Sequence, residues 1–144
     1  MSDFNSAPLL LHSVIDRGQP NRERIALFAR EDLSTSRYCL LIGVSVSEND
    51  AIPIPDNSLW LGSGSLRRGD WIFVYTGPGT PRTDPLNENK IYSIYWNRDK
   101  TVFFDSTIVP ILIQTNDVWV SPPPHPTTSL PQFDTQKLTG PMHK

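Results

Sequence analysis

Short segments of strand-forming residues recur about every ten residues through the first 120 residues of the chain. They are rich in Val, Ile, Phe, Tyr and Trp, which fit a pleated, half-buried surface. No window has the apolar spacing of an amphipathic helix together with a start and a stop signal. The pattern therefore predicts an all-β fold, either a β-sandwich or a small barrel of about eight short strands. The predicted strands cover residues 9–15, 22–30, 37–46, 58–62, 70–77, 90–96, 101–105, 108–114 and 117–120.

Two of these segments carry further information about their place in a sheet. In 70–77, alternation puts Trp71, Phe73 and Tyr75 on one face and two aliphatic residues on the other, so both faces are apolar and a central strand is expected. Pro110 interrupts 108–114, and because proline cannot donate a ladder hydrogen bond, this strand should lie at an edge or bend. Residues 97–100, Asn-Arg-Asp-Lys, are expected to form a hairpin turn.

The C-terminal part of the chain differs in composition from the rest. Six of the 14 prolines follow residue 121, and apolar residues are sparse there. Such a segment buries too little surface to offset its conformational entropy. We therefore expect a domain over residues 1–121 and a proline-rich tail over 122–144 that is disordered or extended with polyproline II character. The alternative is a segment that docks on a partner through Phe133 and Leu138.

Composition limits the classes of function. The 13 basic residues are scattered and outnumbered by 15 acidic ones, so nucleic-acid binding is not expected. A single cysteine, Cys39, excludes an intrachain disulfide and fits a reducing compartment. The N-terminus lacks the basic region of a signal peptide, and no apolar run approaches the roughly 20 residues of a membrane span. A cytoplasmic protein without a membrane span is the resulting expectation.

The stretch RRGDWIFVYTGPGT, residues 67–80, contains two apparent binding motifs. A phosphate-binding glycine loop needs a following helix and free N–H groups, but Pro81 and Pro85 come next and no helical pattern follows. The Arg-Gly-Asp triplet is explained by a turn before a strand. We therefore expect a strand that ends in a long surface connection over residues 76–90, where Gly77 and Gly79 allow positive φ.

The order of several motifs resembles that of a lamin-tail domain. These motifs are RIALFAR, DLSTSRYCLLIG, SLRRGDWIFVYTGPGT and IYWNRDKTVFF, and they span about residues 22–120. The resemblance implies an immunoglobulin-like β-sandwich. It also implies a non-catalytic module that binds proteins, and in some family members nucleic acid.

Residues for catalysis or metal binding are few. Two of the three histidines, His125 and His143, lie in the predicted tail, and no pair has metal-ligand spacing, so no metal site and no cofactor are expected. A nucleophilic pair of Cys39 and His12 stays open, because such partners meet in space and not in sequence. A lone cysteine in an apolar strand is more commonly a small core residue.

The leading functional hypothesis is a non-catalytic protein-binding or assembly module that acts through sheet edges, loops or an aromatic face, with a protein partner or a second copy as its ligand. The candidate binding residues are Arg82 and Asn87 in the long connection and Trp71, Tyr75, Tyr95 and Trp96 in two strands. Loops on rigid sheets commonly carry recognition, whereas the aromatic residues could equally form core. One alternative is a structural component of a phage or secretion particle. The other is a small hydrolase-like enzyme that uses His12 and Cys39.

Overall fold

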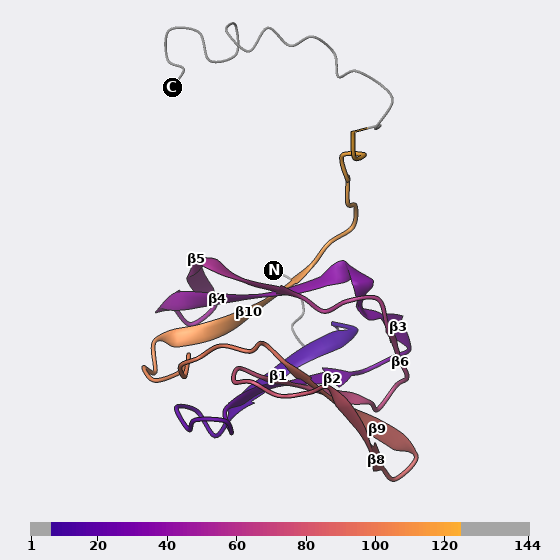
Figure 1. The fold of residues 1–144 in the computed structure, drawn as a ribbon, viewed down its shortest axis with the longest axis horizontal. Coiled ribbons are helices and arrows are strands. Elements are labelled where there is room, and N and C mark those ends of the chain that lie inside the picture. The colour runs from indigo at the N-terminus through magenta and orange to yellow at the C-terminus, as the bar shows by residue number, and fades with distance from the viewer. Residues whose placement is uncertain (1–6, 125–144) are drawn as a thin grey trace, which may run out of the picture.

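The computed structural model describes residues 7–124, and this part of the chain forms an all-β fold (Figure 1). Three sheets account for its strands, and a single 3₁₀ turn is the only helical element in the same range. Within these residues no helix has the length and apolar character needed to cross a membrane. The prediction of an all-β fold is confirmed.

The largest sheet has five strands in the order β1-β2-β7-β9-β8. β1 (Leu9–Ile15) and β8 (Arg82–Leu86) are its edges, and β7 (Trp71–Tyr75) lies in the middle between β2 (Arg24–Ala29) and β9 (Asn89–Tyr95). Neighbouring strands are antiparallel except β7 and β9, which are parallel. The central position predicted for 70–77 is therefore confirmed.

A second sheet has three antiparallel strands. β4 (Tyr38–Ser47) lies between β5 (Asp50–Trp60) and β10 (Ile108–Gln114). Pro110 is in β10, an edge strand, as its missing N–H requires. A short ladder of β3 (Leu33–Ser34) and β6 (Ser65–Leu66) adjoins the 3₁₀ turn η2 (Thr35–Arg37), which leads into β4.

Buried side chains of both larger sheets belong to one core. Figure 1 shows β4, β5 and β10 on one side of the molecule and β1, β2, β8 and β9 on the other. Each fully buried aliphatic side chain contributes about 1.5–3 kcal/mol through the area it removes from water. One face of each sheet is thus occupied by packing, and the opposite faces, the edges and the turns are left for recognition. The core side chains at these sheets include Ile25, Leu27, Leu40, Ile42, Ile72 and Val74.

The predicted strands at 9–15, 22–30, 37–46, 70–77, 90–96 and 108–114 are confirmed. The prediction at 58–62 is too short, because it is the end of β5, which starts at Asp50 and contains Pro53 and Pro55. Likewise, the connection predicted over 76–90 contains β8, which includes Pro85. Both strands are sheet edges, where N–H groups that face outward are not needed for pairing.

The strand predicted at 101–105 is wrong, and with it the hairpin turn at 97–100. The backbone N–H groups of Val102 and Phe103 donate to the carboxylate of Glu23, at 2.6 and 3.1 Å, and not to a neighbouring strand. The N–H of Gly18 and the hydroxyl of Thr76 donate to the same carboxylate, at 3.0 and 2.5 Å. Glu23 is 1% exposed, so a single buried side chain joins three loops.

The strand predicted at 117–120 is also wrong. After β10 the chain leaves the sheets as an extended, exposed segment over residues 116–124, which we call the arm (Figure 1). Of the predicted tail, residues 122–124 belong to the arm. Phe133 and Leu138, with the remainder of 125–144, lie outside the described residues.

Candidate functional site

The outer face of the five-stranded sheet carries a cluster of aromatic side chains. In β7, Ile72 and Val74 point into the core, so alternation turns Trp71, Phe73 and Tyr75 outward. Among residues 7–124 no further sheet packs on this side. The strand register places Phe28 of β2 opposite Trp71, and Tyr95 of β9 opposite Tyr75. We call Phe28, Trp71, Phe73, Tyr75 and Tyr95 the aromatic face.

The rings of the aromatic face contact one another. Trp71 is at the centre, with its ring 4.8 Å from that of Phe28, 6.0 Å from that of Phe73 and 5.2 Å from that of His12 on β1. These three pairs are inclined at 54°, 65° and 74°, whereas Tyr75 and Tyr95 stack at 5.0 Å and 17°. Tilted and stacked pairs of this kind add about 0.5–1.5 kcal/mol each beyond their buried area. The face therefore consists of two packed groups of rings, one around Trp71 and one formed by the two tyrosines.

A guanidinium group lies on the same face. Arg24 of β2 sits 5.3 Å from the ring centre of Phe73 and 5.4 Å from that of Tyr75. Its Nη1 donates to Asp16 Oδ2 at 3.0 Å and to the carbonyl of Arg22 at 2.8 Å, while its Nε is buried without a partner in the described structure. These contacts hold the cation over the rings and leave one donor unused.

The TGPGT bend, residues 76–80, supports one end of the aromatic face. A Cβ atom at Gly79 would lie 2.4–2.7 Å from the ring of Tyr95, so the glycine is required by close approach. Gly77 and Gly79 do not adopt the positive φ that glycine allows, whereas Gly18, Gly62 and Gly69 do. The bend thus packs its backbone at Gly79 against the ring of Tyr95.

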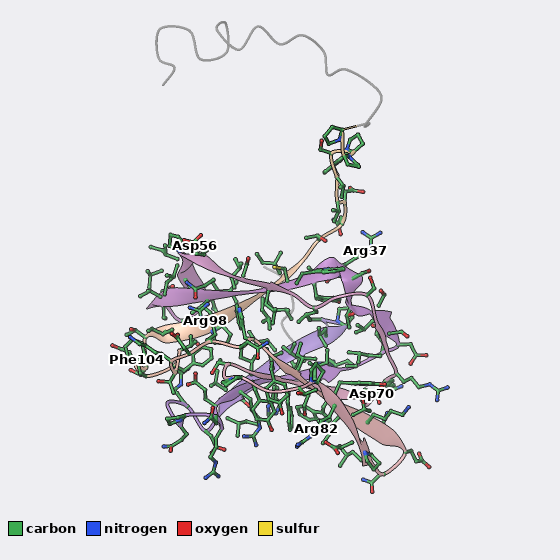
Figure 2. All side chains as sticks on the ribbon, in the orientation of Figure 1. Arg37, Asp56, Asp70, Arg82, Arg98 and Phe104 are labelled. Carbon is green, nitrogen blue, oxygen red and sulfur yellow. The ribbon has the colours of Figure 1, made fainter. Side chains whose placement is uncertain are left out.

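Arg82 lies beside the tyrosines, and Asn87 lies apart from them. Arg82 pairs in register with Ser93 of β9, two residues before Tyr95, and its Nε donates to Asp84 Oδ2 at 3.0 Å. That hydrogen bond and the charge of Asp84 raise the pKa of Arg82 above its ordinary value. Figure 2 shows Arg82 on the side of the molecule opposite the arm. Asn87 is in the turn between β8 and β9 with a φ of 55°.

The structure brings together three of the four predicted aromatic site residues, Trp71, Tyr75 and Tyr95. Trp96 packs against the core, because it follows Tyr95 and so faces the other way. Phe28, Phe73 and Arg24 are not among the site residues predicted from the sequence. Alternation within each strand already put them on the correct side, and the missing information was that β2 pairs with β7.

The other motifs do not form a site. His12 contacts Trp71 in the five-stranded sheet, whereas Cys39 pairs with Trp60 and Ile113 in the three-stranded sheet, so the two are not brought together. Cys39 is only partly buried and does not belong to the core. Asp70 of the Arg-Gly-Asp triplet is 2% exposed and accepts hydrogen bonds from its own chain, so its carboxylate is not free for a receptor.

No model of a known protein family, no curated protein and no solved structure matches this chain.

Proposed function

We propose that this chain is a non-catalytic binding module with an immunoglobulin-like β-sandwich fold of lamin-tail type, and that its aromatic face binds a protein partner. The shared core of the two larger sheets supports the sandwich. The motif order between residues 22 and 120 supports the family type. The observation that carries the binding proposal is the packed cluster of five rings and one arginine on the outside of a sheet.

Residue types support a protein as the partner. Tyr, Trp, Phe and Arg are enriched at the centres of protein interfaces, where a few of them supply most of the binding energy. The aromatic face supplies Tyr, Trp and Phe, and Arg24, which lies over Phe73 and Tyr75, adds the fourth type. Side chains that already pack on one another lose less conformational entropy on binding.

The geometry of the rings is less suited to a sugar or a nucleic acid. Stacking of a base requires a free ring face, and the same is true of a sugar. Here the rings of Tyr75 and Tyr95 stack on each other. The ring of Trp71 is flanked by the inclined rings of His12 and Phe28. Arg24 and Arg82 are each paired with an aspartate, so little net positive charge is left to attract phosphate.

The absence of catalysis in this proposal is supported by the placement of His12 and Cys39 in different sheets. A nucleophilic cysteine needs its base within hydrogen-bond reach.

The proposal is tested by affinity capture from extracts of the source cells under native conditions, with three baits compared quantitatively. The baits are the parent protein, Trp71→Ala and Phe104→Ala. Phe104 is 72% exposed and lies away from Arg82 in Figure 2, so it is the matched control. We expect one or more proteins to be retained by the parent and by Phe104→Ala and lost with Trp71→Ala.

Binding of the purified partner should weaken by about 30-fold or more for Trp71→Ala, which corresponds to the 2 kcal/mol of an interface hot spot. Tyr75→Ala serves as a second face variant if Trp71→Ala unfolds, which circular dichroism detects. Equal retention of every captured protein by the face variants would refute the proposal, as would capture of none by the parent.

A further inference from the structure

The arm exposes three consecutive apolar side chains. Val118, Trp119 and Val120 are 66%, 87% and 81% exposed, whereas Trp71 and Trp96 pack on neighbours and Trp60 is 58% exposed. A tryptophan left almost fully in water forfeits the burial of roughly 150–250 Å². Such a segment is typical of one that packs against another molecule.

The base of the arm is fixed to the 3₁₀ turn η2. The N–H and hydroxyl of Thr115 donate to the carbonyl of Arg37, at 2.8 and 3.2 Å. The guanidinium of Arg37 donates in turn to the carbonyl of Asn116. Arg37 therefore directs the arm away from its own sheets, and Figure 2 shows this residue next to the arm base.

A groove lies directly beside this base. It is lined by Ser36–Cys39 on one side, Trp60 on β5, and residues 115–118 of the arm itself. Trp60 is 58% exposed, and its Nε1–H donates to the carbonyl of Ser36 at 2.8 Å, which fixes the ring. Ile113, the register partner of Cys39, is 38% exposed and extends the apolar surface along β10.

We infer that two copies of this chain exchange their arms, so that Trp119 of each packs into the groove of the other against Trp60 and Cys39. In one chain the groove lies next to the base of the arm. A two-fold axis close to Arg37 would therefore place the arm of each copy beside the groove of the other copy, and both contacts would form together. Trp119 lies four residues beyond Thr115, a reach of about 13 Å in an extended chain. The inference uses a different surface from the aromatic face and does not rest on the proposed function.

The occupant is a second copy because this one chain supplies both complementary parts. The apolar arm matches the apolar wall formed by Trp60 and Ile113, and Asp117 of the arm matches the charge of Arg37 at the groove. Each Trp119 would bury about 150–250 Å² of its own surface and a comparable area of the groove, so the two exchanged tryptophans together account for about 600–1,000 Å². That area is below the roughly 1,200 Å² of a standard interface, so a weak dimer that depends on concentration is expected.

The first test is the molar mass of the full chain in solution, measured by sedimentation equilibrium over a range of concentrations. We expect a monomer–dimer equilibrium that is weakened by 30-fold or more in Trp119→Ser, because a central tryptophan is a typical hot spot. Trp119 is 87% exposed in the single chain, so its replacement should leave the fold intact. Phe104→Ser, at another exposed aromatic position, is the control and should dimerise as the parent does. A monomer at every concentration, or a dimer that Trp119→Ser does not weaken, would overturn the inference.

The second test uses Cys39, the single cysteine of the sequence, which lines the groove. In Val120→Cys, at an exposed arm position next to an intact Trp119, mild oxidation should produce a disulfide between Cys39 of one copy and the new thiol of the other, identified by peptide mapping of the dimer band. Glu88→Cys, in an exposed turn, is the control and should give no such dimer. A disulfide confined to one chain, one that joins the two new cysteines, or no disulfide at all would contradict arm exchange.

Discussion

At the scale of single residues, turn geometry explains the placement of several polar side chains. All five described non-glycine residues with positive φ are Asp or Asn, namely Asp16, Asn21, Asp56, Asn87 and Asn97. These two residue types tolerate the left-handed region because their short side chains bond the local backbone. Asn87 is thus accounted for by its turn, and its predicted role in binding stays a prediction.

Asp70 is a residue whose charge is needed for the structure around it. Its Oδ1 accepts from Asn89 Nδ2 and the N–H of Lys90, at 2.9 and 3.0 Å, and its Oδ2 accepts from the N–H of Arg67 at 2.8 Å. Burial alone would raise the pKa of Asp70, but these hydrogen bonds and the charge of Lys90 lower it below the ordinary value. The folded state therefore favours the ionised carboxylate.

We predict that Asp70 makes the free energy of unfolding depend on pH below about 4. Because the pKa is lower in the folded state, the stabilisation is complete above the unfolded pKa and is lost as the pH falls through the folded pKa. Asp70→Asn should lower the free energy of unfolding by about 1–3 kcal/mol at pH 7, because the new NH₂ group would face a donor and leave it without an acceptor. The difference from the parent should shrink between pH 5 and pH 2 in urea titrations.

Asp99→Asn, at an exposed position, is the control for this titration and should follow the parent at each pH. A gap between the parent and Asp70→Asn that stays constant down to pH 2 would contradict the assigned role of the charge.

At the scale of secondary-structure elements, the side chain of Glu23 connects loops that are not joined to one another by β-ladder hydrogen bonds. Its carboxylate accepts from Gly18, Thr76, Val102 and Phe103, so the loops before β2, after β7 and before β10 meet at one buried point. All four contacts are donors, so the site requires a side chain that only accepts. Thr76 begins the bend that supports Tyr95, which connects this point to the aromatic face.

We predict that Glu23→Gln destabilises the protein by about 1–3 kcal/mol, because the amide N–H₂ would face a buried donor. Hydrogen exchange should become faster at the Val102 amide or at the Phe103 amide, depending on which one faces the new NH₂ group, because these two amides donate to different carboxylate oxygens and glutamine keeps one oxygen. Glu48→Gln, at an exposed position, is the matched control and should change neither quantity. Unchanged protection of both amides in Glu23→Gln would show that the carboxylate is not what orders this loop.

Strand patterns are local and could be predicted from the sequence, whereas the long-range contacts of Glu23 could not. Six strands were predictable because alternation and β-branched content are local properties. The strand β8 was missed and β5 was predicted too short, because their tolerance of proline depends on having no neighbour on one side. The apolar run at 101–105 looks like a strand, and only the distant Glu23 takes its N–H groups instead. The aromatic face was only partly predictable for the same reason. The sequence shows which side chains of one strand share a face, but it does not show that β2 pairs with β7.

At the scale of the whole molecule, the two larger sheets depend on each other for burial. Leu40 of β4 and Leu27 of β2 are both 0% exposed and belong to the same core, although they lie in different sheets. An isolated three-stranded sheet would leave the inner face of β4 in water. The sandwich that we propose should therefore unfold as one cooperative unit.

We predict that Leu40→Ala lowers the free energy of unfolding by about 2–5 kcal/mol. Both larger sheets should lose this stability to the same extent. Under conditions where exchange reports global unfolding, the most protected amides of β2 and β7 should lose the same free energy as those of β4, although the substitution lies in the other sheet. Ile52→Ala, at a 61% exposed position on β5, is the control and should cost under about 0.5 kcal/mol. If protection falls in β4, β5 and β10 while β2 and β7 keep theirs, the sheets are separate units and the single-sandwich proposal is wrong.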